Sequence, residues 1–207
     1  RAFLLWGLRS YLIKGTPHIP APRPISRIAE LPPGILWLLT GLSQPITGMV
    51  VGAVAGFHLF GLFVWQSWQK RSGRTADWAI VTKYFFTAMK AGSVALPLVL
   101  YSALVFSLDP FLKIWVEQSR IPAPHLFHYL AAFGVVIPFV LVGIPRLMKN
   151  QPEWGALPVT WIILTPVLLI LPFSLQRRLV EGLWIVLVLV ALIPLENLVS
   201  KTWRWAY

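Results

Sequence analysis

Long apolar runs alternate with short polar connections along this chain, which is the pattern of a protein that crosses a membrane several times. The nearly uncharged runs are 33–43, 46–68, 91–108, 126–148, 157–173 and 179–199. An α-helix rises about 1.5 Å per residue, so roughly 20 residues cross the ~30 Å hydrocarbon core. Five runs approach that length, whereas 33–43 either crosses as a short helix or dips in and returns. We therefore predict an all-α fold, a polytopic integral membrane helical bundle with about five transmembrane helices plus one short or re-entrant helix.

The N-terminal part has a different character from the rest. Residues 1–32 combine an amphipathic start with a basic, proline-rich stretch. The prolines that prevent a regular helix there are Pro17, Pro20, Pro22 and Pro24. We predict a surface segment over 1–32, lying on the membrane, followed by one transmembrane helical domain over 33–207.

Composition supports the membrane class. Of 207 residues, 57% are hydrophobic and 12% are charged, and mean hydropathy is +0.71, whereas soluble domains carry about 25% charged residues. The net charge of +11 indicates basic loops on the cytoplasmic side and contact with anionic lipid headgroups. Nucleic acid is not an expected partner, since the basic residues form no aromatic-interleaved patch. The chain lacks cysteine. It opens on Arg1 without a signal-peptide pattern, so we expect a piece of a longer protein.

Loop charges predict the orientation. The stretch 69–90 holds five lysines and arginines against one aspartate, so the positive-inside rule places it in the cytoplasm. Counting predicted spans from there puts 109–125 outside, 149–156 inside, 174–179 outside and 200–207 inside. The whole topology inverts if the basic loop is misassigned.

The stretch LPFSLQRRLVEG, residues 171–182, places polar side chains between two apolar runs on the predicted outer face. These are Gln176, Arg177, Arg178 and Glu181. Arginine grips phosphate in a bidentate way, so the stretch predicts a substrate site for a lipid phosphate. The alternative is an ordinary polar turn, in which Glu181 pairs with Arg178 or favours the start of the next helix.

The other predicted outer connection offers residues that would line the same cavity. They are Asp109, Glu117, Arg120, His125 and His128. A carboxylate at Asp109 could act on a substrate hydroxyl or a metal, or simply form an Asp-Pro turn. Glu117 and Arg120 have the spacing of a surface ion pair. Two histidines without a third ligand define no metal site, and no paired-carboxylate motif is present, so the catalytic residues are unknown.

His58 lies in the middle of the run 46–68, within GAVAGFHLFG. An ionisable residue inside a membrane span is a functional hypothesis by default. The neighbouring Gly and Ala residues allow close approach, so His58 is a candidate axial ligand for a haem or chlorophyll. The alternative is a neutral imidazole that is hydrogen-bonded between helices. No cofactor follows from the sequence.

Two quoted stretches carry a family resemblance. LVLYSALVFSLDPFLKIWVEQSRIPAPHLFHYLAAFGVVIPFVLVGIPRL and LPFSLQRRLVEGLWIVLVLVAL, together about residues 95–192, resemble the later part of bacterial GT-C superfamily glycosyltransferases. The resemblance implies a lipid-phosphate-linked sugar donor, such as a polyprenyl phosphate, used on the extracytoplasmic face of the bacterial cytoplasmic membrane. Arg177 and Arg178 are similar in position to the donor-phosphate site, and the loop from Asp109 to His125 would line the same cavity.

The chain departs from that family in one respect. The acidic catalytic motif of the family's first external loop has no equivalent here. If the resemblance holds, the chain is the non-catalytic portion of a longer enzyme or a relative without activity. The alternative function is a non-catalytic membrane subunit of a larger respiratory or photosynthetic complex, which packs against protein partners or a pigment.

Overall fold

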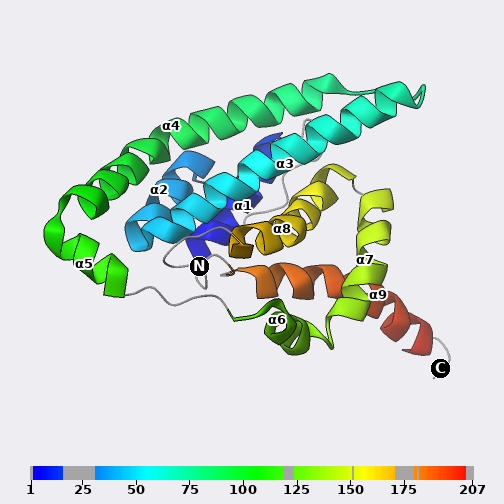
Figure 1. The fold of residues 1–207 in the computed structure, drawn as a ribbon. Helices are drawn as coiled ribbons and strands as arrows, with labels where there is room; N and C mark the ends of the chain where they lie inside the picture. Colours follow the sequence, from blue (N-terminus) through cyan, green and yellow to red (C-terminus); the bar gives the residue numbers. More distant parts are fainter. Residues whose placement is uncertain are drawn as a thin grey trace. The chain divides into compact units, whose positions relative to one another are not determined.

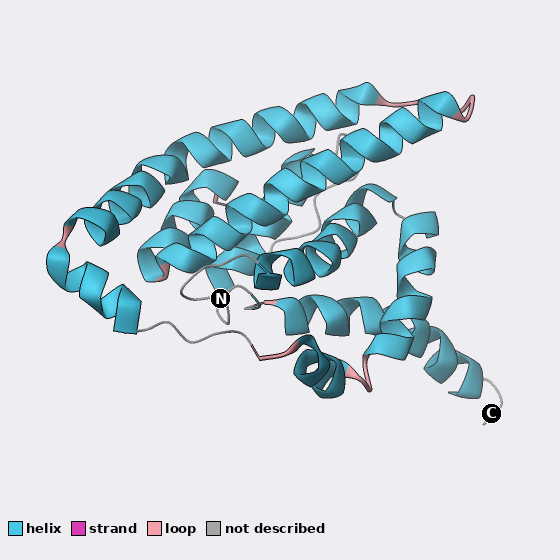
Figure 2. Cartoon of the chain, viewed as in Figure 1, coloured by secondary structure: helices cyan, strands magenta, loops and turns pink. Residues whose placement is uncertain are grey.

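A computed structural model describes residues 2–15, 31–118, 124–150, 152–170, 180 and 182–203. All regular elements in those ranges are helices (Figure 2), which confirms the all-α prediction. The helices divide into two compact units, Arg1–Arg120 and Ile121–Tyr207. This boundary lies inside the stretch 33–207 that the sequence assigned to a single domain.

The described part of the first unit contains five helices. They are α1 (Ala2–Gly15), α2 (Pro33–Ser43), α3 (Pro45–Arg71), α4 (Trp78–Leu108) and α5 (Pro110–Gln118). The bounds of α2 match the predicted short helix, and α3 covers the predicted run 46–68. By contrast, α4 begins well before residue 91, because the mostly apolar and aromatic residues around Lys83 and Lys90 continue the helix towards its N-terminus.

A tight turn joins α3 to α4, and from it the two helices run back side by side (Figure 1). Gly73 supplies a left-handed backbone conformation with φ of 71°. The Asp77 carboxylate accepts a hydrogen bond from Ala79 N at 3.0 Å and so caps α4. The Asp77 backbone N–H in turn donates to Gln66 Oε1 at 2.9 Å. Arg74 lies over the Trp68 ring, 5.7 Å from its centroid. Within the basic stretch 69–90, residues 72–77 form this turn, and the rest belongs to α3 and α4.

The first helix packs into this unit. Leu4, Leu8 and Tyr11 recur at helical spacing and are buried, and α1 contacts α2, α3 and α4. The Ser10 hydroxyl donates to the Leu31 carbonyl at 3.0 Å. Residues 1–32 were predicted to be a surface segment, but the apolar face of α1 is buried against neighbouring helices. The amphipathic pattern is the same for a helix on a membrane and a helix on a protein core.

Two glycines let α2 approach its neighbours closely. A Cβ at Gly34 would lie 3.0 Å from Val94 Cβ and 3.2 Å from Ala91 Cα on α4. A Cβ at Gly48 of α3 would lie 3.1 Å from Gly41 Cα on α2. Both contacts are tighter than ordinary van der Waals packing, so glycine brings these helices close together.

Four helices are described in the second unit. They are α6 (Leu126–Phe133), α7 (Ile137–Asn150), α8 (Pro152–Ile170) and α9 (Leu183–Trp203). The sequence predicted one span over 126–148, but α6 and α7 are separate helices that meet at 79°. Gly134 lies at the break, and Pro138 has no N–H to continue the hydrogen-bond ladder across it.

One hydrophobic core cluster of the second unit lies between α7 and α9. The buried residues of this cluster are Val140, Leu183, Leu187, Val190 and Ala191. A side chain at Gly143 on α7 would collide with the Val190 carbonyl on α9. The two helices therefore touch through their backbones at this point, and α8 packs against both.

Fewer helices qualify as membrane spans than the sequence predicted. Within the described residues, α3, α4 and α8 are long and apolar enough to cross, and the bent pair α6–α7 makes a fourth if it counts as one span. Two shorter apolar segments are α2 (Pro33–Ser43) and the Leu183–Glu196 part of α9. The class of integral membrane helical protein agrees with this result, while the prediction of five spans is not confirmed.

Candidate functional site

The predicted phosphate site falls in a part of the chain that the structure does not describe. This applies to Gln176, Arg177, Arg178 and Glu181, and also to Arg120. The flanking helices are described: α8 ends at Ile170, α9 begins at Leu183, and the two helices contact each other. Arg177 and Arg178 therefore belong to the connection between two apolar helices that are packed together.

Asp109 forms the junction between α4 and α5. Its Oδ1 accepts hydrogen bonds from Phe111 N at 2.9 Å and Leu112 N at 3.1 Å. The carboxylate thus accepts hydrogen bonds from backbone N–H groups at the start of α5, as an N-cap aspartate does. This geometry favours the Asp-Pro turn over a carboxylate that acts on substrate.

The proposed outer cavity combines residues from both units. Asp109 and the exposed Glu117 belong to the first unit, whereas His125 and His128 belong to the second. Each residue is placed within its own unit, so the shared cavity stays a prediction.

His125 and His128 make local contacts at the start of α6. His125 Nδ1 accepts weakly from Phe127 N at 3.5 Å, and its ring stacks on that of Phe127 with centroids 5.2 Å apart. His128 Nδ1 lies 3.3 Å from the His125 carbonyl oxygen. Among the described residues, no group of three or more His, Cys, Asp or Glu side chains is arranged to hold a metal ion. His125 therefore caps the start of α6, and His128 contacts the backbone of the same turn.

His58 lies at the centre of a buried aromatic cluster formed with Tyr11 and Tyr84. Its exposed fraction is 0%, and its Nδ1 lies 3.2 Å from the Tyr11 hydroxyl. The Tyr84 ring meets the imidazole edge-on with centroids 5.1 Å apart, and the Tyr84 hydroxyl donates to the Leu12 carbonyl at 3.2 Å. The cluster therefore ties α1, α3 and α4 together through polar contacts inside an apolar bundle.

This environment bears on the pigment hypothesis. An axial ligand needs open space beside one ring nitrogen for a flat macrocycle. Around His58, two tyrosine rings pack against the imidazole, and the described surroundings leave it fully buried. The arrangement does not fit a macrocycle without displacing those rings, so it favours an imidazole that is hydrogen-bonded between helices.

Sequence reasoning found His58 but missed both of its tyrosine partners. Tyr11 follows Leu4 and Leu8 at helical spacing, and this stripe was a signal that α1 buries one face. Tyr84 lies within 69–90, which was predicted to face the cytoplasm, and its separation from Tyr11 along the chain left no local signal.

No family model matches the chain, and no curated protein or solved structure matches it either.

Proposed function

We propose that the chain is an integral membrane protein that binds a lipid-linked phosphate through Arg177 and Arg178. The observation that supports this is their place between α8 and α9, two apolar helices that contact each other. Arginines in such a connection are best stabilised at the membrane surface, because a charged side chain is costly in hydrocarbon. Lipid phosphates lie at that same level, and a guanidinium fork matches a phosphate oxygen pair.

The ligand that the GT-C resemblance favours is a polyprenyl-phosphate-linked sugar on the extracytoplasmic face. In glycosyl transfer, the two guanidinium groups would stabilise the phosphate as it departs from the sugar. The proposal assigns binding of the donor to this chain and assigns no catalytic base. Asp109, the carboxylate considered for that role, is occupied in capping α5.

A double variant tests the phosphate site. Arg177→Ala with Arg178→Ala should weaken polyprenyl-phosphate binding by the purified chain in lipid nanodiscs about 30-fold, because each interfacial cation contributes about 1 kcal/mol. The matched control is Arg146→Ala with Lys149→Ala, which removes two exposed cations from α7. Unchanged binding in the arginine variant, or an equal loss in the control, refutes the proposal.

The exposed surface of α4 favours a second function, that of a non-catalytic subunit within a membrane complex. Only 6% of the apolar window of α4 is buried within the chain. Its large exposed side chains include Phe85, Phe86, Leu96, Leu100 and Leu104. Such a surface suits lipid or the helices of a partner protein.

An absorption spectrum of the purified protein tests the pigment version of this function. A visible porphyrin or chlorophyll band that disappears in His58→Ala would support it. A colourless protein purified from its native membrane would refute pigment binding.

A further inference from the structure

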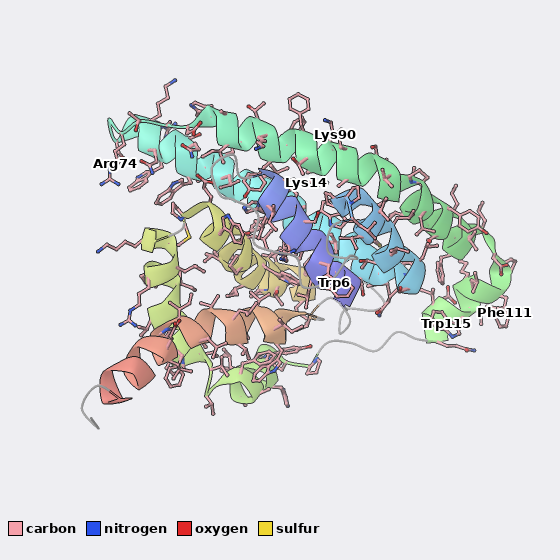
Figure 3. The ribbon with its side chains drawn as sticks, turned by 180° about the vertical axis from the view of Figure 1, so that it is seen from behind. Trp6, Lys14, Arg74, Lys90, Phe111 and Trp115 are labelled. Carbon is pink, nitrogen blue, oxygen red and sulfur yellow. The ribbon has the colours of Figure 1, made fainter. Side chains whose placement is uncertain are left out.

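A cavity of about 500 Å³ opens in the first unit where α1, α2 and α4 meet. Both charged and apolar side chains line it, among them Lys14, Pro33, Ile35, Lys90, Ala91 and Val94. The two lysines come from different helices, α1 and α4 (Figure 3). A volume of this size is within the range of about 300 to 1,000 Å³ that is typical of small-molecule sites.

The charges around the cavity favour an anion. Lys14 and Lys90 each carry an ammonium group with three hydrogen-bond donors, and the described lining contains no carboxylate. The N-terminal end of α2 also lies at the cavity. No side chain caps it, and its first turn holds no acidic residue, so the positive end of the helix dipole is not neutralised there. The ammonium groups of Lys14 and Lys90 and the N-terminal end of α2 therefore border the same cavity.

The walls of the cavity favour an amphiphile over a free ion. Ile35 is 39% exposed and Val94 is 43% exposed, while Gly34 and Ala91 behind them are buried. Gly34 packs so closely on Ala91 that the apolar wall is continuous between α2 and α4. A hydrocarbon chain gains free energy on such a surface, whereas inorganic phosphate makes no use of it.

The predicted span 91–108 relates the cavity to the level of the lipid headgroups. Lys90 directly precedes the uncharged stretch 91–108, which spans about 27 Å at 1.5 Å per residue and so approaches the ~30 Å hydrocarbon core. Asp109 follows at the far end of this stretch. If 91–108 is the part of α4 that crosses, Lys90 lies at the membrane boundary on the side of the α3–α4 turn, which is the side predicted to face the cytoplasm.

We propose that this cavity binds the phosphate of an anionic phospholipid from the leaflet on the side of the α3–α4 turn. Lys14 and Lys90 contact the phosphate, and Ile35 and Val94 lie along the acyl chain. The site is separate from the Arg177–Arg178 connection in its residues and in the predicted membrane face. A negative result for the Lys14–Lys90 cavity therefore does not refute the proposed function of Arg177 and Arg178. A negative result for those arginines does not refute the cavity.

Lipid binding to the purified full chain tests the proposal. Native mass spectrometry counts bound phosphatidylglycerol and phosphatidylcholine. Lys14→Gln with Lys90→Gln should lower phosphatidylglycerol affinity about 30-fold, because each cation contributes about 1 kcal/mol, and leave phosphatidylcholine binding unchanged. The control Lys70→Gln with Lys83→Gln removes two exposed cations near the α3–α4 turn, which do not line the cavity. It should lower the affinity less than about threefold, as expected for a diffuse surface charge.

A second variant separates shape from charge. Ile35→Trp keeps both lysines and fills the cavity beside them, so it should also lower phosphatidylglycerol affinity. The proposal is wrong if the lysine variant binds as the unmodified chain does, or if the control loses as much affinity. It is equally wrong if inorganic phosphate at millimolar concentration displaces the lipid, because the apolar walls would then contribute nothing.

Discussion

Gly15→Ala should destabilise the first unit far more than its small size suggests. Gly15 ends α1 against the ring of Tyr84, and a Cβ there would lie 2.6 Å from Tyr84 Cζ and collide with Cδ1 and Cε1. Carbon atoms pack best at about 3.5 to 4.0 Å. The added methyl group can therefore be accommodated only if the Tyr84 ring or the end of α1 moves.

Tyr84 has little freedom to move. Its side chain is fully buried, its hydroxyl donates to the Leu12 carbonyl, and the His58 ring lies against it. Overpacking a core costs about 1 to 3 kcal/mol, and loss of the hydroxyl hydrogen bond adds about 1 kcal/mol. We expect the free energy of unfolding to fall by about 2 to 4 kcal/mol.

Unfolding in mixed micelles with increasing sodium dodecyl sulfate, followed by far-ultraviolet circular dichroism, measures this change. The matched control is Gly92→Ala on α4, where a Cβ meets nothing within 4 Å. That substitution should stabilise the helix by up to about 1 kcal/mol through propensity alone. In a Tyr84→Ala background the cost of Gly15→Ala should fall close to zero. A loss no larger than that of Gly92→Ala, or an unchanged cost in the Tyr84→Ala background, would refute the packing.

The next predictions concern the bond to His58, the cap at Asp109 and the membrane topology. Tyr11→Phe removes the hydroxyl bonded to the buried imidazole and should cost about 1 kcal/mol of unfolding free energy in the same micelle titration; no loss contradicts the bond. Asp109→Ala should cost about 1 kcal/mol by uncapping α5, whereas Asp109→Asn retains an acceptor and should cost a few tenths; equal losses in the two variants contradict the cap. Because the chain has no cysteine, single variants Ser72→Cys, Gln118→Cys and Ser174→Cys report sidedness with an impermeant thiol reagent. The first two should be labelled from opposite sides of the membrane, and Ser174→Cys should be labelled with Gln118→Cys; labelling of Ser174→Cys with Ser72→Cys contradicts an outer phosphate site.

The bend between α6 and α7 decides how that last result is understood. If the bent pair crosses as one span, the connection holding Arg177 and Arg178 lies on the same side as 109–125. If the pair enters and returns, the connection lies on the opposite side. The sequence predicted a single run over 126–148 from its apolar composition and missed the bend at Gly134, because an apolar run does not show where a helix changes direction.

Parts of the candidate sites were within reach of sequence reasoning. Asp109 was expected either to act on substrate or to form a turn, and the structure favours the turn because Oδ1 bonds to two backbone N–H groups. Lys90 directly precedes the predicted run 91–108, whereas Lys14 belongs to the segment 1–32 that was predicted to lie on the membrane surface. The phosphate hypothesis for Arg177 and Arg178 stays a prediction, since both lie outside the described residues.

The sequence by itself determined the class of this protein and the bounds of helices such as α2 and α3. Hydrophobicity, helix length and proline position act locally, so a single pass along the chain reveals them. Only the tertiary structure decided that Tyr11, His58 and Tyr84 meet, and that Lys14 and Lys90 share a cavity. These contacts join residues far apart in the chain, and their energies depend on which helix faces are buried together. A local pattern shows that a face is apolar, but it does not show which neighbour covers that face.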